Sequence, residues 1–246
     1  FTAFGTINNW YWDFGNGQTS TSQFPTLNYN VPGDTLVKLF VRSAQGCESD
    51  TLLKTIHIFG RPVVDYNFTD SVCLGTSSNF FGSLISSTDP VSNWGWNFAD
   101  TSTGITNTQN ASYTFSTAGI HNVTFMATSN GSAGCMGIKV KPVFVADKPR
   151  AAIKSASACE SEQIQLLDSS YTTDGLLLTS WWWDLGNGQF SNQQNPLVTY
   201  TTAGSKTIKL VVTNSRNCIS DTITSIINIE SKPIAKFSIG TTLCNN

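Results

Sequence analysis

The sequence predicts an all-β chain of tandem β-sandwiches arranged end to end. Three observations carry this prediction. One residue pattern recurs at spacings of 84 and then 87 residues, turn signals separate short alternating segments about every 8 to 12 residues, and helical periodicity never lasts beyond one turn. A repeat of about 85 residues has the length of one seven-stranded sandwich.

Each repeat carries a signature turn that begins with a tryptophan. Residues 12–17 read Trp-Asp-Phe-Gly-Asn-Gly, residues 96–101 read Trp-Asn-Phe-Ala-Asp-Thr, and residues 183–188 read Trp-Asp-Leu-Gly-Asn-Gly. Asn-Gly is the strongest short hairpin signal, because both central residues of the turn need a positive φ. The second copy lacks this dipeptide, so the geometry of its turn is expected to differ.

A tyrosine, a glycine turn and an alternating strand follow each signature turn. The strands are expected at residues 35–42, 122–127 and 207–213. Because side chains alternate between the two faces of a strand, the signature tryptophans point into the sandwich. The aromatic residues expected in the core are Trp12, Trp96, Trp183, Tyr29, Tyr113 and Tyr200.

The repeats divide the chain into four segments. Residues 61–147 and 148–231 form complete repeats, residues 1–60 form a repeat that lacks its first strand, and residues 232–246 are the first strand of a further repeat. Residues 1–5 match residues 78–82, well inside the second repeat, so the chain is expected to be a piece of a longer protein. The junctions are too short for flexible linkers, and their prolines suit the start of a strand.

Composition excludes several classes of function. Only 12% of the 246 residues are charged, about half of the ~25% usual in globular proteins, and the net charge is −2 without basic clusters. Nucleic acid is therefore excluded as a partner, since its binding requires several lysines or arginines on one face. No apolar stretch approaches the ~20 residues of a membrane-spanning helix, so the chain is not expected to span a membrane.

The signature turn and the elements that follow it resemble the PKD (polycystic kidney disease) domain, whose hallmark is Trp-Asp-Phe-Gly-Asp-Gly. Residues 12–17 and 183–188 match this hallmark well, with asparagine in place of the second aspartate, whereas residues 99–101 depart from it. The resemblance covers nearly the whole chain, in three consecutive copies. It implies an immunoglobulin-like sandwich and an extracellular location, but no single activity.

The regular cysteines and the many serine, threonine and asparagine residues resemble tandem PKD arrays of large secreted cell-surface proteins of Bacteroidota, including gliding-motility adhesins exported by the type IX route. The function implied is a non-catalytic stalk of an adhesin or filament, rigidified by disulfides. Its partners would be neighbouring repeats of the same chain, and surface polysaccharide or other surface proteins. PKD units also act as spacers in secreted hydrolases. A hydrolase spacer and a polysaccharide-binding module are therefore the alternatives.

The same resemblance implies modification sites, because Bacteroidota attach O-glycans at Asp-Ser/Thr-aliphatic motifs. The motif occurs four times and makes Thr35, Thr51, Ser71 and Thr222 candidates for O-glycosylation. Solvated strand ends in a threonine-rich chain are the alternative explanation.

Six cysteines at regular positions are expected to form disulfides rather than a metal site. Pairing within a repeat would give Cys73–Cys135 and Cys159–Cys218, and pairing between repeats would give Cys73–Cys218. Pairing of sequence neighbours would use all six candidates, which are Cys47, Cys73, Cys135, Cys159, Cys218 and Cys244.

Sandwich geometry separates these schemes in part. The two cysteines of one repeat are expected at opposite ends of the sandwich, about 20 Å apart, beyond the bridging limit of about 7 Å between Cα atoms. Stacked repeats would bring the base of one to the top of the next, which slightly favours Cys73–Cys218. A hairpin at each junction would still allow sequence neighbours to pair, so the connectivity stays open.

No residue pattern predicts catalysis. His57 and His121 have no serine, cysteine or carboxylate partner repeated in their sequence context, and no run of aspartates supplies the six oxygen ligands of a Ca²⁺ site. Asp13, Asp184, Asp100 and Asn97 are expected to accept hydrogen bonds from the amides of the signature turns. We therefore expect neither enzyme activity nor a metal or cofactor.

The strand before each signature turn is rich in aromatic residues. Its outward position holds Tyr11, Gly95 and Trp182 in the three repeats, so no aromatic platform recurs. Trp182 is the single candidate for a contact with a glycan, by stacking on a sugar ring.

Overall fold

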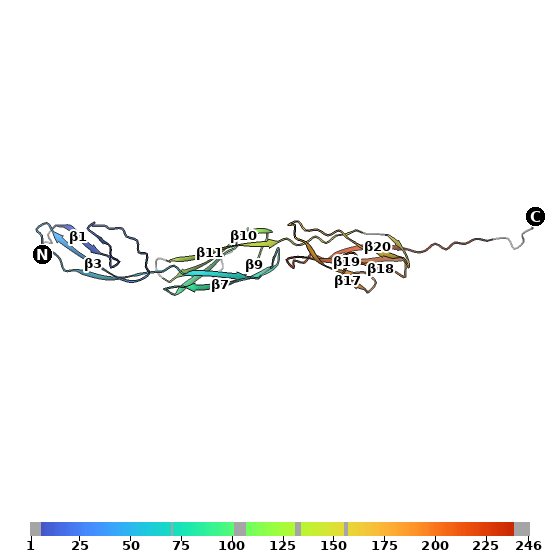
Figure 1. Ribbon diagram of the computed structural model, residues 1–246, viewed down its shortest axis with the longest axis horizontal. Helices are drawn as coiled ribbons and strands as arrows, with labels where there is room; N and C mark the ends of the chain where they lie inside the picture. Colours follow the sequence, from blue (N-terminus) through green and yellow to red (C-terminus); the bar gives the residue numbers. More distant parts are fainter. Residues whose placement is uncertain (1–5, 70, 101–106, 131–133, 155–156, 239–246) are drawn as a thin grey trace, which may run out of the picture. The chain divides into compact units, whose positions relative to one another are not determined.

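The computed structural model describes residues 6–69, 71–100, 107–130, 134–154 and 157–238. Every regular element in these ranges is a β-strand, as Figure 1 shows. No helix in this part of the chain is long and apolar enough to cross a membrane. The chain divides into two compact units, which comprise residues 1–68, 79–113 and 121–142, and residues 69–78, 114–120 and 143–246.

The first repeat contributes one antiparallel sheet to the first unit, with the strand order β2-β1-β3-β4. The strands are β1 (Ile7–Asp13), β2 (Thr19–Ser20), β3 (Gly33–Ser43) and β4 (Leu52–Ile58). The long hairpin of β3 and β4 places Asp34 opposite His57. This register places an aspartate and a histidine next to each other at the end of the first repeat.

The second repeat has two sheets, with the orders β6-β11-β10-β8 and β5-β7-β9. The strands are β5 (Val63–Phe68), β6 (Val72–Cys73), β7 (Ser77–Ser86), β8 (Val91–Asn97), β9 (Asn110–Thr114), β10 (Gly119–Ser129) and β11 (Met136–Ala146). Tyr66, Phe80, Trp96 and Phe125 come from both sheets and are 0% exposed. The two sheets thus enclose an aromatic core, as a sandwich requires.

The third repeat lies in the second unit. Its main sheet has the order β13-β20-β19-β16-β17, and β12-β15 and β14-β18 form two short pairs. The strands are β12 (Ile153–Lys154), β13 (Ala158–Cys159), β14 (Gln163–Gln165), β15 (Leu167–Asp168), β16 (Leu178–Asp184), β17 (Phe190–Ser191), β18 (Leu197–Thr199), β19 (Gly204–Asn214) and β20 (Ile223–Glu230). Ile164 and Leu166 join Trp183 and Leu210 in one buried cluster.

The aspartates cap the signature turns of the first and third repeats as the sequence predicts, but the predicted two-residue Asn-Gly turn is wrong. The positive φ angles lie at the glycines on either side of the asparagine and not at Asn16 or Asn187. Asp13 Oδ1 accepts a hydrogen bond from the amide of Gly15 at 2.9 Å, and Asp184 Oδ1 accepts one from Gly186 at 3.0 Å. Both glycines have a φ of 71°, and a Cβ atom at either would lie within 2.5 Å of a carbonyl oxygen. Glycine is therefore required at both positions.

The turn of the second repeat keeps this arrangement without the glycine. Asn97 Oδ1 accepts a hydrogen bond from the amide of Ala99 at 2.9 Å, and Ala99 has a φ of 51°. An alanine in the left-handed region is strained by about 1–2 kcal/mol. This turn therefore differs from the other two signature turns by a strained backbone at Ala99.

The expected core differs in burial between the repeats. Of its six aromatic residues, three are at most 2% exposed and three are half-buried. The buried ones are Trp96, Trp183 and Tyr200, and the half-buried ones are Trp12, Tyr29 and Tyr113. Trp12 occupies the same strand position as Trp96, but no second sheet covers it among the described residues.

Backbone hydrogen bonds fix the register of the first repeat. The carbonyl of Thr6 accepts from the amide of Ala44, just as the carbonyl of Pro90 accepts from Asn130 and that of Leu177 from Ser215. Thr6 is therefore the counterpart of Pro90. The described part of the first repeat begins at β1, the counterpart of β8, and has no counterpart of β5 or β7. Residues 1–5, which the sequence aligned with residues 78–82, lie outside the described residues.

The segment after β20 forms no strand over residues 231–238. Its apolar side chains are exposed, Ile234 at 82% and Phe237 at 90%. The assignment of residues 232–246 to a further repeat stays a prediction, since residues 239–246 lie outside the described part.

Candidate functional site

Two junctions between consecutive repeats bring together side chains that can do chemistry, a histidine with two aspartates at the first and two bonded cysteines at the second. The first junction lies around residues 57–62 and the second around residues 145–150, each within one of the two compact units. Over the described residues, no group of three His, Cys, Asp or Glu side chains could hold a metal ion.

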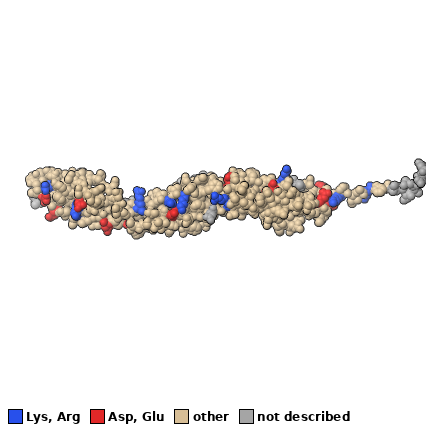
Figure 2. All heavy atoms as spheres, in the orientation of Figure 1, with Lys and Arg blue, Asp and Glu red and all other residues tan. Residues whose placement is uncertain are grey.

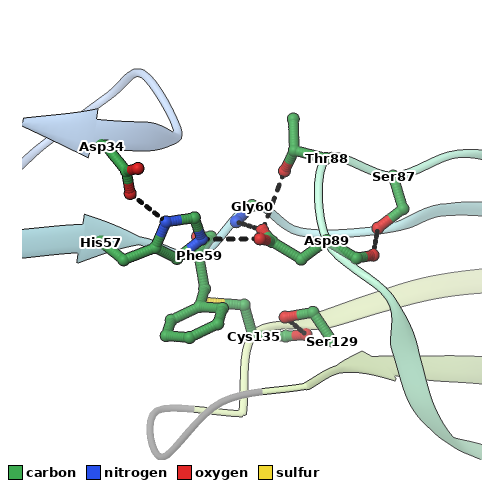
Figure 3. Close-up of polar contacts among 9 residues, drawn as sticks. All are labelled: Asp34, His57, Phe59, Gly60, Ser87, Thr88, Asp89, Ser129 and Cys135. Carbon is green, nitrogen blue, oxygen red and sulfur yellow. Dashed lines mark hydrogen bonds and ion pairs between the residues drawn. The ribbon is translucent and has the colours of Figure 1, made fainter.

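His57 is the centre of the first junction (Figure 3). It lies near the end of β4, and its Nδ1 is 2.6 Å from Oδ1 of Asp34 on β3. Its Nε2 is 2.7 Å from Oδ1 of Asp89, which belongs to the loop between β7 and β8 of the second repeat. One imidazole ring thus links the hairpin of the first repeat to a loop of the second.

Asp89 is buried, at 8% exposure, and both oxygens of its carboxylate have polar partners. Its Oδ2 accepts hydrogen bonds from the amide of Gly60 at 2.8 Å and from the hydroxyl of Thr88 at 3.0 Å. The amide of Gly60, followed by the His57 ring, lowers the pKa of Asp89 below its ordinary value. The carboxylate therefore stays ionised where it meets His57.

The protonated form of His57 suits this site best. An ionised carboxylate only accepts hydrogen bonds, and an imidazole has two N–H donors only when it is protonated. The hydrogen bonds to Asp34 and then to Asp89 accordingly raise the pKa of His57 above its ordinary value of 6.5. The first junction is thus an ion-paired bridge whose strength depends on pH.

Sequence reasoning missed this bridge. The sequence places His57 in an alternating segment and offers no serine, cysteine or carboxylate partner that recurs in its context. The register of the β3–β4 hairpin, which places Asp34 opposite His57, was a signal that could have found half of it. Asp89 is 32 residues away in sequence and reaches His57 only through the path of the second repeat.

A disulfide between Cys73 and Cys218 is the centre of the second junction. Cys73 ends β6 of the second repeat, and Cys218 lies between β19 and β20 of the third. The two Cα atoms are 5.6 Å apart, and 145 residues separate them in sequence. This is the pairing between repeats that the sequence left open beside two others.

Three of the other disulfide candidates are unpaired, so neither pairing within a repeat nor pairing of sequence neighbours occurs among the described cysteines. Cys47 is an exposed free thiol, and Cys135 and Cys159 are half-buried free thiols. The reason is positional: Cys135 Sγ lies 3.3 Å from the carbonyl of Phe59 in the preceding repeat, and Cys73 faces the following repeat. Cys244 lies outside the described residues.

Asn214 supports the disulfide from the end of β19. It is 0% exposed, and its Oδ1 accepts hydrogen bonds from the amides of Arg216 and Cys218, both at 3.0 Å. Its Nδ2 donates to the carbonyl of Asp147 at 3.2 Å, and the amide of Asp147 donates to Asp174 at 2.9 Å. A buried side chain thus ties the cysteine loop to the chain segment that joins the two repeats.

Trp182 is 43% exposed and forms an aromatic pair with Phe190, with ring centroids 5.4 Å apart and planes 25° apart. Tyr11, at the same position of the first repeat, stacks on Phe40 at 4.6 Å. Gly95 leaves the second repeat without such a pair. The structure places an exposed ring where the sequence expects one, next to a shallow depression lined by four residues, Trp182, Phe190, Ser191 and Asn192.

The four candidate glycosylation residues differ in exposure. Thr51 and Thr222 are exposed and immediately precede β4 and β20, which are counterparts in the first and third repeats. Thr35 and Ser71 are half-buried. Exposure therefore favours Thr51 and Thr222 as acceptors.

A family model described as PKD domain matches residues 2–58, 60–141 and 146–229, which is nearly the whole chain in three copies. The chain belongs to the PKD domain family. The three matched segments fall on the three repeats described above, so each repeat is one PKD repeat.

Two crystallised PKD domains are similar in sequence to about a third of the chain. The PKD1 domain of Vibrio anguillarum Epp is 29% identical and covers 35% of this chain and 99% of its own, with a TM-score of 0.32. The PKD1 domain of the Vibrio cholerae metalloprotease PrtV is 30% identical and covers 34% of this chain and 98% of its own, with a TM-score of 0.30.

Among curated proteins, the pre-pro-metalloprotease PrtV of Vibrio cholerae serotype O1 is 46% identical over 54 residues. This match covers 22% of the chain and 6% of PrtV. The chain is thus similar to PrtV over one segment that is shorter than a complete repeat, and it spans a small part of that protein's length.

Proposed function

We propose that this chain is a non-catalytic spacer of an extracellular protein, in which PKD repeats set a distance between other parts. The observation that carries the proposal is the disulfide that joins consecutive repeats, Cys73 to Cys218. A covalent tie between repeats restricts bending and resists separation under load.

The short connections support the same role. Only four residues separate β4 from β5 across the first junction, and six separate β11 from β12 across the second. Their backbone is fastened by buried side chains, Asp89 at the first junction and Asn214 at the second. Short fastened connections leave little room for the independent motion of repeats.

The surface suits an extracellular stalk. Lysines, arginines, aspartates and glutamates are scattered over a mostly uncharged surface on the face shown in Figure 2. We propose the stalk of a cell-surface adhesin or filament exported by the type IX route, as in gliding motility, with O-glycans on the exposed Thr51 and Thr222. Mass spectrometry of the protein from its native host would test the glycans: unmodified peptides at both residues would contradict them.

A small-angle scattering experiment tests the spacer role. The full chain with Cys47→Ser, Cys135→Ser and Cys159→Ser keeps only the Cys73–Cys218 bond among the described cysteines. We expect one narrow distribution of dimensions for the oxidised protein and a broader one after reduction. Equally broad distributions in both states would contradict the proposal, because the bond would then not restrict the repeats.

The second candidate is a spacer within a secreted hydrolase, which the sequence similarity to a segment of PrtV favours. The genomic sequence on both sides of the chain separates the two. Many further PKD repeats support the adhesin stalk, whereas a catalytic domain within one or two repeats supports the hydrolase spacer.

The aromatic pair of Trp182 and Phe190 favours a third candidate, a polysaccharide-binding repeat. A glycan array probed with the full chain tests it. Saturable binding that is lost in Trp182→Ala and kept in Trp10→Ala would support this candidate, and no binding by the unaltered chain would contradict it.

A further inference from the structure

One face of the sheet in the first repeat carries core-type side chains without a covering sheet. An open groove of about 580 Å³ runs along this face. Its apolar lining includes Trp12, Tyr29, Val37, Leu39, Leu52 and Ile56. Leu52 is 65% exposed, and the other five are half-buried. A monomeric domain rarely leaves such a set of large apolar side chains open to solvent.

The same face is covered in the other two repeats. Strand pairing places Leu39 opposite Trp12 and Phe125 opposite Trp96, so Leu39 and Phe125 are counterparts. Phe125, and Leu210 at the same position of the third repeat, are 0% exposed. The open face therefore has the composition of a sandwich core that lacks its second layer.

β5 and β7 provide the cover in the second repeat. Tyr66 on β5 and Phe80 on β7 pack against Trp96, with ring centroids at 5.0 and 5.7 Å. The hydroxyl of Tyr66 also donates to the carbonyl of Val123 at 2.9 Å. Val37 is the counterpart of Val123, so the first repeat offers the same acceptor position to a covering strand.

Cys135 points independently to the same partner. It is the counterpart of Cys218, because each cysteine carbonyl accepts a hydrogen bond from the amide that ends the preceding long strand, Ser129 or Asn214. Cys218 is bonded to Cys73, which follows the first strand of the preceding repeat by five residues. Cys135 is a free thiol in the equivalent place at the first junction.

We propose that the open face binds a two-stranded segment of the β5–β7 type that continues the first repeat in the register of the second, and that the cysteine after its first strand forms a disulfide with Cys135. The two thiols lose two protons and two electrons as the S–S bond forms. A small-molecule disulfide such as oxidised glutathione accepts them and leaves as two thiols. This inference does not depend on an adhesin or hydrolase context.

An in-register extension of the full chain tests the proposal. Because Thr6 is the counterpart of Pro90, a copy of residues 61–84 joined ahead of residue 1 continues the first repeat in the register of the second. Under a glutathione redox buffer, we expect amide hydrogen exchange in β1 and β3 to slow by about tenfold or more. Peptide mapping should also find the copied cysteine bonded to Cys135.

Two matched extensions separate the packing from the disulfide. An extension with the copied Cys73→Ser should still protect β1 and β3, while Cys135 stays free. An extension with the copied Tyr66→Ser and Phe80→Ser keeps the cysteine but should leave β1 and β3 as exposed as in the unextended chain.

Three results would overturn the proposal. Unchanged exchange in the extended chain means that the face does not take β5–β7-type strands. Protection by the doubly serine-substituted extension means that the apolar side chains are not what binds. Protection of the unextended chain together with a doubled mass in sedimentation equilibrium means that the occupant is a second copy.

Discussion

The two junctions lie at equivalent places in the repeat but use different chemistry. At the first junction His57 bridges Asp34 and Asp89, and at the second a disulfide joins Cys73 to Cys218. The first therefore responds to pH and the second to reduction. Cys135 and Cys218 are counterparts, so the first junction carries a free thiol in the place that the disulfide takes at the second.

The comparison predicts the largest effect from loss of the disulfide. Cys73→Ser should lower the free energy of unfolding of the third repeat by about 2–4 kcal/mol, because a bond that closes a long loop restricts the unfolded chain. Hydrogen exchange of β19 and β20 against urea measures this locally. Cys47→Ser, at an exposed free thiol, is the matched control and should change little. Equal stability of the two variants would contradict the role assigned to the disulfide.

Gly60→Ala should have the next largest effect, and only at the first junction. A Cβ atom there would lie 2.2 Å from the hydroxyl of Thr88 and 3.2 Å from the side chain of Pro32. We expect a loss of about 1–3 kcal/mol, as for other overpacked buried positions. Hydrogen exchange of the amides around Asp89 measures it. Adding Thr88→Ala removes the clashing atom and should restore part of the loss, whereas full protection in Gly60→Ala would show that the site is not tightly packed.

The pH response is a smaller effect and is confined to the first junction. The pKa of His57 is raised in the folded protein, so protonated His57 contributes to the free energy of unfolding. This contribution is complete below the unfolded-state pKa and is lost as the pH rises through the folded-state pKa above 6.5. The pKa of Asp89 is lowered in the folded protein, so the contribution of its carboxylate to the free energy of unfolding is lost only as the pH falls through a folded-state pKa below 3.8. NMR titration of His57 should give a raised pKa that returns towards 6.5 in Asp89→Asn. An ordinary pKa in the unaltered chain would contradict the bridge.

The smallest effect is expected at Lys148, whose Nζ is 3.3 Å from Oδ1 of Asp221 beside the second junction. Asp221 is 91% exposed, and exposed ion pairs contribute little. Lys148→Ala should shift the urea midpoint of the third repeat by less than Cys73→Ser does. A comparable shift would mean that charge, and not the disulfide, holds this junction.

The sequence predicts those features that depend on local chemistry. The repeat pitch, the all-β class and the capped signature turns follow from residues such as Asp13 and Gly15, which act over a few positions. The sequence allows three pairing schemes, of which Cys73–Cys218 is one. The two thiols are 145 residues apart, so only the folding of two complete repeats brings them together.

The first repeat shows where sequence reasoning ends. The bridge between His57 and Asp89 depends on how a loop of the second repeat meets the first, which no local pattern encodes. The match of residues 1–5 to residues 78–82 rests on residue type and lies outside the described residues. The place of Thr6 follows from its hydrogen bond with Ala44, which depends on the pairing of β1 with β3. Long-range pairing therefore decided what local patterns could not.

Force–extension of the full chain held by its two ends tests the mechanical role of the disulfide most directly. The bond closes a loop of 145 residues, which cannot extend until it is reduced. We predict that the total gain in contour length is shorter by roughly 500 Å in the oxidised chain than in the reduced chain. Equal gains in both states would contradict the account, because the covalent tie between the second and third repeats would then not bear load.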